Sequence, residues 1–358
     1  MKDNINILFI SDGLSTGGKE RQLAEIIKSL NKKENYRTGI ITFNREQHFS
    51  EYIKSNVHYF KELKKRPTRL EPFFSIWIHI RRFKPDIIHT WDSLSSMYTY
   101  LPARIFTIKF IDGSVRDAGI EKGWQFFLKR FFLKRADLII SNSEAGLTHY
   151  GFSGEVLYNA IDIKRFPIQT RGKEINLIMV ANFTVYKDHS TFIRAGLALL
   201  KDGIVDNVYL AGDGPHKQNY VDLINSTYSI YSDRIFFLGS ISNVEENLAK
   251  CTFGVLCSTL EYAEGISNSV LEYMAAGLIA ISTDVGGMKE VIEDGVNGFL
   301  IPPGDSDMIV KIITKLRLDR NTCNTITENA RRTISEKFSC EGNINKLMSI
   351  YSGLCTKK

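Results

Sequence analysis

The sequence predicts an α/β protein with two domains, each built on a parallel β-sheet with helices on both faces. Short, β-branched apolar runs alternate with longer amphipathic segments along almost the whole chain, as in βαβ units. The runs are continuously apolar, which is typical of strands buried on both faces of a parallel sheet. The length of 358 residues gives room for two domains of ordinary size.

The apolar runs fall into two series that divide near residues 166–171. They predict Rossmann-like, doubly wound domains at 1–168 and 169–335, with a C-terminal helix in 336–358 that returns to the first domain. A helix is expected over residues 20–30, after the first strand. Ligands of such sheets bind outside the carboxyl ends of the strands, so the site is expected in a cleft between the domains. The expected strands are 5–10, 38–43, 86–90, 107–111, 137–141 and 155–158, then 175–180, 207–211, 234–238, 254–257, 278–283 and 298–301.

Composition argues against several classes of protein. With 43% hydrophobic and 24% charged residues, the chain is typical of a soluble globular protein. No apolar run approaches the roughly 18 residues of a membrane span, and the N-terminal run is too short for a signal-peptide core, so a cytoplasmic protein is expected. Five cysteines without a C-x-x-C pair argue against a disulfide framework or a zinc site.

Basic residues are concentrated in the first half of the chain. Residues 1–170 carry 27 Lys and Arg against 18 Asp and Glu, with clusters at 61–69 and 122–135. The second cluster also predicts a helix, which is either a core helix with a solvated basic side or a surface helix that meets anionic lipid. No stacking module or DNA-reading motif supports nucleic-acid binding. The apolar positions of this helix recur every three or four residues: Trp124, Phe127, Leu128 and Phe131.

The run E-G-I-S-N-S-V-L-E at residues 264–272 places two glutamates around a short segment. Ser269 and Glu272 fit an S-x-x-E capping box at the start of an apolar helix that Gly277 ends. Glu264 lies outside that helix, and the amides that follow it line the helix N-terminus, where an anion is favoured. These amides belong to Gly265, Ile266 and Ser267.

Three further loops follow predicted strands. Gly17 and Gly18 follow the first strand and let a backbone approach a ligand closely, although the G-x-G-x-x-G spacing of a nicotinamide-dependent oxidoreductase is absent. Lys187 precedes a helix after the first strand of the second series, and Gly212 lies in A-G-D-G-P after the next strand. Taken alone, each feature also fits a plain turn or a solvated lysine.

In their order along the chain, these segments resemble glycosyltransferase family 4, a family of retaining nucleotide-sugar enzymes. T-G-G-K-E-R at 16–21 is similar to the family's N-terminal glycine loop, and Y-N-A-I-D at 158–162 to its interdomain stretch. The resemblance covers nearly the whole chain and implies a GT-B fold, in which two Rossmann-like domains face a central cleft. The ordered set in the second half is Lys187, A-G-D-G-P, the E-x7-E signature of Glu264 and Glu272, D-V-G-G at 284–287 and G-V-N-G-F-L at 295–300.

The resemblance also implies roles for individual residues. Lys187 would contact the donor diphosphate, Glu264 the hydroxyls of the transferred sugar, and Glu272 the ribose. Glu264 and Lys187 are the expected catalytic residues, and a lysine with a helix N-terminus can stabilise a departing diphosphate without a metal. The backbone around Leu238 would receive the base. The expected donor-binding set is Gly17, Gly18, Asn182, Lys187, Gly212, Leu238, Glu264, Gly265, Ile266, Ser267, Asn268 and Glu272.

Two positions depart from the family's pattern. Asn182 stands where the family often has arginine, which removes a second cation from the diphosphate. The family's usual N-domain histidine is missing from residues 111–116, so Asp112 or Arg116 is expected on the acceptor side instead. His89 ends a predicted strand at the cleft. A lone histidine in this setting is more often structural, and we assign it no catalytic role.

These features predict a retaining glycosyltransferase that moves a hexose-type sugar from a nucleotide sugar to a growing glycan. No cofactor or metal is expected, and a UDP-sugar is favoured over a GDP-sugar as donor. The acceptor is expected to be lipid-linked, as in capsule, O-antigen or exopolysaccharide synthesis, with the basic half peripheral on an anionic membrane at the inner face of the cell membrane. The alternatives are a small soluble acceptor, or a nucleotide-sugar-binding regulator that lost catalysis at Asn182 and Asp112.

Overall fold

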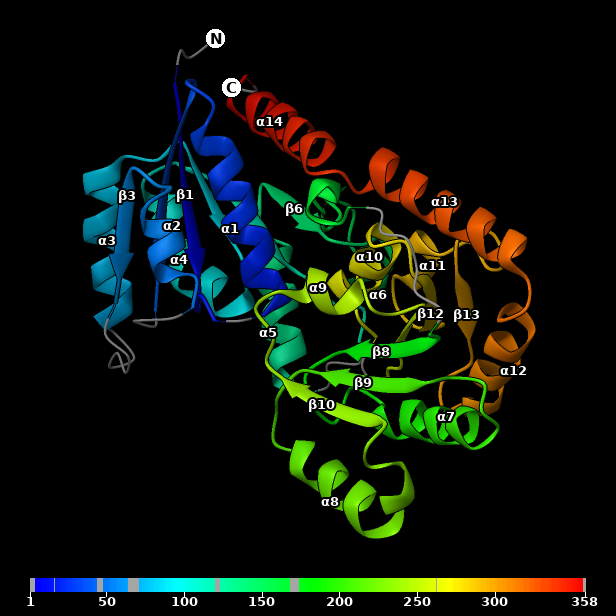
Figure 1. Ribbon diagram of the computed structural model, residues 1–358. Helices are drawn as coiled ribbons and strands as arrows, with labels where there is room; N and C mark the ends of the chain where they lie inside the picture. Colours follow the sequence, from blue (N-terminus) through cyan, green and yellow to red (C-terminus); the bar gives the residue numbers. More distant parts are fainter. Residues whose placement is uncertain are drawn as a thin grey trace. The chain divides into compact units, whose positions relative to one another are not determined.

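The computed structural model describes residues 4–15, 17–43, 48–63, 71–119, 123–167, 174–261 and 263–356. The chain forms two compact units (Figure 1). Met1–Asn159 and Cys340–Lys358 make the first unit, and Ala160–Ser339 makes the second. The boundary expected between residues 168 and 169 lies outside the described residues.

The first unit is built on a seven-stranded parallel sheet in the order β3-β2-β1-β4-β5-β6-β7. All six strands expected in this half are present, and the sequence missed β3. That strand lies at the edge of the sheet, is only half-buried and reads Y-F-K-E, so it lacks the apolar run that marks the central strands. The strands are β1 Ile5–Ser11, β2 Tyr36–Thr42, β3 Tyr59–Glu62, β4 Ile87–Thr90, β5 Lys109–Val115, β6 Leu138–Ser141 and β7 Glu155–Val156.

Helices cover both faces of this sheet because successive residues of a strand point to opposite faces. Ile7 and Phe9 of β1 pack in one core with helices α1 and α14, whereas Leu8 and Ile10 pack in the other core with α3 and α4. The helices are α1 Gly18–Asn31, α2 Ser50–Lys54, α3 Glu71–Phe83, α4 Ser93–Ile105, α5 Trp124–Leu133, α6 Glu144–Tyr150 and α14 Cys340–Thr356.

The C-terminal helix α14 belongs to the first unit although it follows the whole second unit in sequence. Ile344, Leu347 and Tyr351 are buried in the core that also contains α1. The Tyr351 hydroxyl lies 2.8 Å from Nδ1 of His89 in β4. The last helix therefore supplies part of the interior of the first unit.

The second unit has a six-stranded parallel sheet in the order β10-β9-β8-β11-β12-β13. The six strands expected from the sequence are all present. The strands are β8 Asn176–Val180, β9 Asn207–Ala211, β10 Ile235–Gly239, β11 Phe253–Leu256, β12 Ile279–Thr283 and β13 Phe299–Ile301. The helices are η1 Ile163–Arg165, α7 His189–Lys201, α8 Lys217–Thr227, η2 Ser229–Tyr231, α9 Val244–Leu248, α10 Asn268–Ala275, α11 Met288–Val291, α12 Ser306–Leu316 and α13 Arg320–Lys337.

Helix α5 forms where the basic, aromatic-rich segment predicted it, but the core-helix interpretation is wrong about which face is buried. Trp124 and Phe127 are each 71% exposed, whereas Lys129 is buried. The Lys129 ammonium lies 2.6 Å from the Tyr150 hydroxyl and 3.4 Å from an Asp117 carboxylate oxygen, so an interior polar cluster compensates its charge. The sequence pattern alone could not reveal these partners.

The described part of the chain contains no helix both long enough and apolar enough to cross a membrane.

Candidate functional site

The predicted donor-binding residues of the second unit gather at one edge of its sheet. Strands β8 to β12 run parallel, so their carboxyl ends meet at the same edge. Asn182 follows β8, Gly212 follows β9, and Leu238 lies at the end of β10. Glu264 lies in the loop between β11 and α10, and Asn268 opens α10. The sheet thus brings together residues that are far apart in sequence.

Lys187 and Glu264 form an ion pair at this edge. The Lys187 ammonium also lies 3.5 Å from the Ser258 hydroxyl. The side chains of Lys187 and Glu264 are 12% and 25% exposed, so a ligand from solvent can reach them. Water also screens the attraction between the two charges less than it would at the surface. The second carboxylate oxygen of Glu264 is buried and has no hydrogen-bond partner among the described residues. A hydroxyl group from a ligand would satisfy that buried acceptor.

Backbone contacts hold Lys187 beside the end of β11. Lys187 and Ser258 form an isolated antiparallel bridge, and the Asp188 amide donates to the Cys257 carbonyl at 3.0 Å. The Asp188 carboxylate caps α7 by accepting from the Thr191 amide at 3.0 Å. The lysine is therefore fixed by its neighbours on both sides, and Ser258 is a site residue that the sequence did not single out.

Two glycines of the D-V-G-G segment hold the backbone of Glu264. The Gly287 amide donates to the Glu264 carbonyl at 3.0 Å and to the Gly265 carbonyl at 3.2 Å. At Gly286 φ is +58°, and a β-carbon there would lie 1.8 Å from the Glu264 carbonyl oxygen. Only glycine fits this position. The segment belongs to the motif series, but its positioning role appears only in the folded structure.

Helix α10 starts earlier than the capping-box pattern predicts. Ser267 is its N-cap residue, and the helix begins at Asn268. Ser269 lies inside the first turn, where its hydroxyl donates to the Val180 carbonyl at 2.7 Å. The predicted capping box of Ser269 and Glu272 is therefore wrong, because the end of β8 takes the hydroxyl that would have capped the helix. Glu272 is 4% exposed, so its carboxylate lies inside the unit rather than at a solvated helix end.

Tyr273 anchors the same helix from within. Its hydroxyl accepts from the Val180 amide at 2.7 Å, and its ring occupies the space that a side chain at Gly254 would fill. Burial raises the pKa of Tyr273, which keeps the hydroxyl neutral and able to bond. Gly277, with φ of +78°, follows the end of α10 as the sequence predicts. The start of α10 is thus fixed against β8.

The amides that precede α10 create a region suited to an anion. Gly265, Ile266 and Ser267 are buried, and they lead into a helix of eight residues whose N-terminus carries partial positive charge. The Lys187 ammonium adds a full positive charge beside the same loop through its ion pair with Glu264. A phosphate group and a polyhydroxylated group therefore have complementary partners at this edge.

Gly212 has a structural requirement beyond a simple turn. Its φ is +139°, and a β-carbon there would lie 2.1 Å from the Ala181 carbonyl oxygen. Its amide donates to the Gly239 carbonyl at 2.8 Å. The loops after β8, β9 and β10 are therefore packed backbone against backbone. Asn182, next to Ala181, is exposed at this packed edge.

His189, at the start of α7, is a buried residue of this region that the sequence did not single out. Its ring stacks on Phe183 with centroids 4.0 Å apart, and its Nδ1 lies 3.1 Å from the Lys187 carbonyl oxygen. Burial lowers the pKa of His189 to about 4, so the ring is neutral near pH 7. A neutral stacked ring here supports the loop that carries Lys187.

The glycine loop of the first unit contains a cluster of charged side chains. Gly17 is the N-cap residue of α1, and a β-carbon there would lie 2.2 Å from a carboxylate oxygen of Glu20. That oxygen is buried and has no hydrogen-bond partner among the described residues, and burial raises the pKa of Glu20. The Lys19 ammonium lies 3.0 Å from Asp12 and 3.7 Å from Glu20. Gly17 therefore stands beside a buried carboxylate, and Gly18 is the first residue of α1.

The candidate acceptor-side residues lie in or just after β4 and β5 of the first unit. His89 is fully buried, and burial lowers its pKa to about 3, so it is neutral near pH 7. A buried, neutral histidine that is hydrogen-bonded to Tyr351 is typical of a structural residue. Asp112 is also buried, accepts from the Ser114 amide at 2.9 Å, and has its pKa raised by burial.

Arg116 follows the end of β5 and packs on an aromatic ring. Its guanidinium lies 3.6 Å from the centroid of Trp91, and its Nε donates to the Gly113 carbonyl at 3.0 Å. Burial lowers the pKa of Arg116 to about 9. One guanidinium nitrogen is buried without a hydrogen-bond partner among the described residues. Arg116 therefore keeps one donor for a further partner.

Comparison with known families matches both units. Residues 16–165 match Glycosyltransferase Family 4, and residues 160–333 match Glycosyl transferases group 1. The chain belongs to glycosyltransferase family 4. Gly17 and Gly18 of the glycine loop follow β1, and Glu264 of the E-x7-E run follows β11, at the carboxyl edges of two parallel sheets.

Relatives of this family 4 protein differ in what their names say they make. N-acetyl-alpha-D-glucosaminyl L-malate synthase of Bacillus anthracis is 28% identical over 242 residues, which cover 63% of this chain and 61% of that protein. The putative colanic acid biosynthesis glycosyltransferase WcaL of Salmonella typhimurium is 23% identical over 212 residues, 53% and 48% of the two chains. The chain thus spans about half to three fifths of the length of these relatives.

A solved structure shows the same fold over the full length. HepE of Anabaena, determined in complex with UDP-glucose, superposes with a TM-score of 0.85 at 20% identity, covering 98% of this chain and 100% of that chain. At this level of identity the likeness establishes the GT-B fold. The prediction of a two-domain GT-B protein of family 4 is confirmed.

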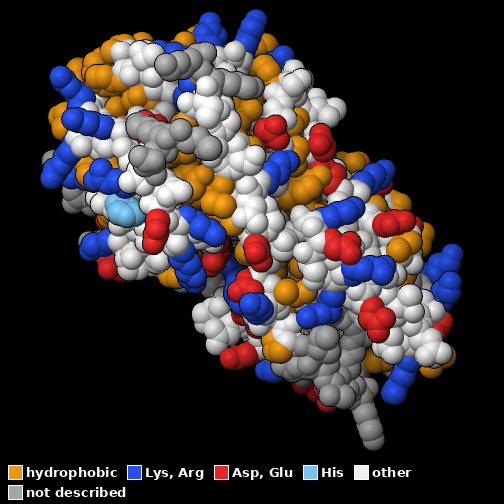
Figure 2. All heavy atoms as spheres, turned by 90° about the horizontal axis from the view of Figure 1, so that it is seen from above, with side chains coloured by type: hydrophobic (Ala, Val, Ile, Leu, Met, Phe, Trp, Pro, Cys, Tyr) orange, Lys and Arg blue, Asp and Glu red, His pale blue; other side chains and the backbone are white. Residues whose placement is uncertain are grey.

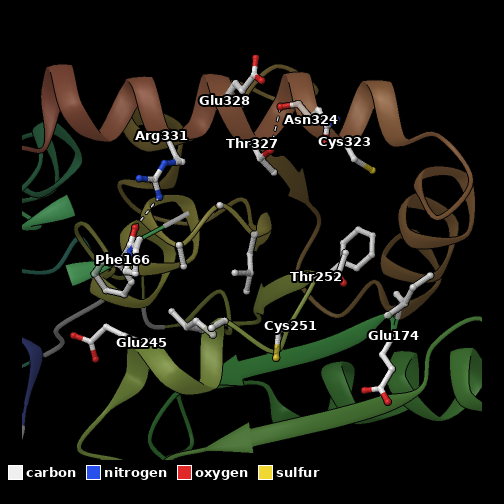
Figure 3. A pocket seen from close by; sticks show the side chains of 18 of the residues that line it. Phe166, Glu174, Glu245, Cys251, Thr252, Cys323, Asn324, Thr327, Glu328 and Arg331 are labelled. Carbon is white, nitrogen blue, oxygen red and sulfur yellow. Dashed lines mark hydrogen bonds between the residues drawn. The ribbon is translucent and has the colours of Figure 1, made fainter. Parts of the chain in front are cut away.

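A hollow of about 760 Å³ lies at the opposite edge of the second sheet (Figure 3). Glu174, Thr252 and Leu278, which line it, lie at or just before the amino ends of their strands. Arg331 projects from α13 toward the same hollow and donates to the Phe166 carbonyl at 3.0 Å. None of the predicted donor-binding residues lines this hollow, so it is separate from the candidate site.

Proposed function

We propose that this family 4 protein is a glycosyltransferase that moves a hexose-type sugar from a nucleotide sugar to a growing glycan, with retention at the anomeric carbon. The observation that carries the proposal is the pair of Lys187 and Glu264, placed beside the N-terminus of α10 with one buried Glu264 oxygen unpartnered. Lys187 is the cation for a phosphate, Glu264 is the acceptor for a sugar hydroxyl, and their ion pair holds the two side by side.

The chemistry of transfer suits these residues. When the sugar leaves the nucleoside diphosphate, negative charge accumulates on the diphosphate, and Lys187 together with the amides before α10 stabilises it. The diphosphate competes with Glu264 for Lys187, which releases the carboxylate toward the sugar hydroxyls. The anomeric carbon meanwhile gains positive character, which a nearby carboxylate favours. Because these groups supply the positive charge, we propose that turnover requires no divalent metal and no cofactor.

Glu272 is proposed to hold the ribose of the donor. Glu272 is buried in the first turns of α10, which supports a role inside the unit. We favour a UDP-sugar over a GDP-sugar because the structurally similar HepE was determined with UDP-glucose. Glu272→Gln should then weaken binding of UDP and of the UDP-sugar together, by about tenfold, as expected for one charge-assisted hydrogen bond. Calorimetric titration measures both affinities.

The proposed acceptor is a lipid-linked glycan of bacterial surface polysaccharide synthesis, such as capsule, O-antigen, lipopolysaccharide or exopolysaccharide. The name of WcaL, a relative in colanic acid biosynthesis, supports this assignment. The excess of Lys and Arg in residues 1–170 suits an anionic membrane, and it implies a peripheral protein on the cytoplasmic face of the cell membrane.

A small soluble acceptor is the second candidate, because the Bacillus anthracis relative is named for the synthesis of a glucosaminyl malate. A third candidate is a nucleotide-sugar-binding protein with impaired catalysis, which the exposed Asn182 in place of a family arginine favours. Incubation with UDP-sugars and either lipid-linked oligosaccharides or small hydroxy acids separates the three. The third requires donor binding with no product from either acceptor.

The test of the mechanism combines stereochemistry with metal removal. We expect NMR of the product to show the anomeric configuration of the donor, and we expect turnover to continue in excess chelator. Inversion at the anomeric carbon would overturn the retaining assignment. Loss of turnover in chelator that magnesium or manganese restores would overturn the metal-independent one.

A further inference from the structure

The exposed hydrophobic side chains of the first unit are concentrated on three helices. Every large hydrophobic residue of this unit that is strongly exposed among the described residues lies on α3, α4 or α5. Soluble proteins commonly expose single apolar side chains, but a set confined to one group of helices marks a surface that is covered in use. The set is Phe74 and Ile78 on α3, Leu94, Leu101 and Ile105 on α4, and Trp124, Phe127 and Phe131 on α5.

These three helices lie side by side on the same face of the sheet. Helix α4 contacts both α3 and α5. Each connects parallel strands that follow one another in the same direction across the sheet, so all three run in the same sense. On α3 and α5 the exposed hydrophobic residues recur every three or four residues, and on α4 they span three turns at helical spacing. The exposed apolar positions therefore lie on the outer side of three neighbouring helices, and we call this side the outer face.

This outer face is distinct from the one that fills the core. Ile76 and Ile80 of α3 and Ala103 of α4 are buried against the sheet, while Phe132 and Leu133 of α5 are buried on the inner side. The helices are thus apolar on two sides, which packing of the unit alone does not require. Lys129 points inward to Asp117, so α5 buries a charge while Trp124 and Phe127 remain outside.

The charge of this face is positive. By sequence, Glu71 is the sole acidic residue in the three helices. Arg81 and Arg82 near the end of α3 and Lys134 after α5 are exposed. Arg104 near the end of α4 is also exposed, but it pairs with Asp137 at 3.0 Å. Because the helices run in the same sense, these cations lie at the same end of the face. Figure 2 shows one side of the molecule, where Lys and Arg side chains lie next to hydrophobic ones.

We propose that the outer face of α3, α4 and α5 is the surface by which this protein binds a bilayer containing acidic phospholipids. The helices lie in the plane of the membrane, with Trp124, Phe127 and Ile78 among the acyl-chain boundary and the arginines at phosphate headgroups. The inference rests on the proposed lipid-linked acceptor and deepens it by naming the surface that meets the membrane. It reaches beyond the basic clusters of the sequence, because α3 and α4 supply most of the face.

A bilayer fits this face better than a second copy of the chain does. In a symmetric dimer the same patch meets itself, so Arg81 and Arg82 would approach their own equivalents, and these helices offer no acidic residue besides Glu71. Like charges brought together in this way oppose association. Phospholipid phosphates supply the missing negative charge, and acyl chains cover the aromatic residues.

The test is co-sedimentation of the full chain with vesicles of phosphatidylglycerol and phosphatidylcholine, compared with vesicles of phosphatidylcholine alone. We expect stronger partition onto the acidic vesicles. The double variant Trp124→Ser with Phe127→Ser should lower this partition by about tenfold or more. Arg81→Ser with Arg82→Ser should lower it by about five-fold for each arginine. The matched controls Ile230→Ser with Leu318→Ser, and Arg317→Ser with Arg320→Ser, change exposed residues of the second unit and should leave partition unchanged.

Three results would overturn the inference. The first is that the original chain binds both kinds of vesicle equally. The second is that the face variants and the controls lose the same amount of vesicle binding. The third is that sedimentation velocity shows a dimer, and that the double variant of Trp124 and Phe127 dissociates it. Unchanged calorimetric binding of UDP shows that a variant remains folded in its second unit. If the protein transfers sugar to a water-soluble acceptor analogue but does not bind vesicles, only the inferred membrane surface is contradicted. If the protein binds vesicles as expected but transfers no sugar, only the proposed function is contradicted.

Discussion

One ion pair of the second unit and two buried contacts of the first unit use ionisable side chains in different ways. In the second unit, Lys187 and Glu264 pair with each other, remain partly accessible and leave a buried carboxylate oxygen unpartnered. In the first unit, His89 is sealed against Tyr351, and Lys129 is sealed against Asp117 and Tyr150.

The difference shows which interactions are arranged for a ligand and which maintain the fold. A partly exposed pair can exchange its partner for a phosphate or a hydroxyl at little cost, because water already solvates part of it. A sealed pair cannot, because removing one partner leaves an uncompensated charge in the interior. We therefore expect changes at the second edge to alter turnover, and changes at the sealed contacts of the first unit to alter stability.

The largest effect is expected for Glu264→Gln. Turnover should fall by a factor on the order of 100, because the carboxylate stabilises the positive centre that develops at the sugar. The affinity for UDP should not fall, since the proposed ligand contact of Glu264 is with the sugar, and the diphosphate displaces Glu264 from Lys187 in any case. Steady-state kinetics and UDP titration measure the two quantities. Glu246→Gln, at an exposed glutamate of α9, is the matched control. A loss of UDP affinity in Glu264→Gln with unchanged turnover would contradict the assigned role.

Asp117→Asn should have the opposite signature. It removes the carboxylate that faces the buried Lys129 ammonium, so the free energy of unfolding should fall by about 2 kcal/mol. Turnover measured well below the unfolding temperature should be unchanged. Urea unfolding gives the stability, and the kinetic assay of the previous variant gives the rate. A large loss of turnover without loss of stability would place Asp117 in the reaction and break the comparison between the ion pair and the buried contacts.

Gly286→Ala should disturb the second edge through its backbone. The added β-carbon would meet the Glu264 carbonyl oxygen, so the loop that carries Glu264 must shift, and turnover should fall by about tenfold. Gly295→Ala is the matched control, because φ is +74° there and no atom lies within 4 Å of the added carbon. Both variants carry similar backbone strain. Equal kinetic losses in the two would show that strain alone, rather than displacement of Glu264, is responsible.

The last expected effect is a pH dependence of stability that both units share. Burial holds the pKa of His189 at about 4 and that of His89 at about 3, below the value of about 6.5 in the unfolded chain. Between these values the unfolded state binds more protons, so stability is fully present above pH 6.5 and falls as the pH is lowered. The loss is about 1.4 kcal/mol per histidine for each pH unit below 6.5.

Urea unfolding at about pH 7 and about pH 5.5 checks this slope. His189→Phe keeps a ring against Phe183 and should remove the share of the slope that belongs to the second unit. His89→Phe should do the same for the first unit. An unchanged slope in both variants would show that other groups dominate the acid response.

Sequence periodicity alone located both sheets. Central strands such as β1 and β12 are continuous apolar runs, because burial on both faces of a parallel sheet leaves no polar side to interrupt them. The edge strand β3 was missed for the same reason, since a half-buried strand has no such run. The order of Lys187 and Glu264 along the chain likewise predicted that these residues meet at the second edge, because the carboxyl ends of parallel strands lie at one edge of the sheet.

Tertiary structure decided what the local pattern leaves open. S-x-x-E permits a capping box, yet the Ser269 hydroxyl bonds to Val180, about ninety residues earlier in the chain. Helical spacing marks Trp124 and Phe127 as an apolar face, yet Lys129 takes the interior because Asp117 and Tyr150 compensate its charge there. A sequence pattern fixes which side chains share a face, but the partner that makes burial favourable comes from distant segments and is visible only once the chain has folded.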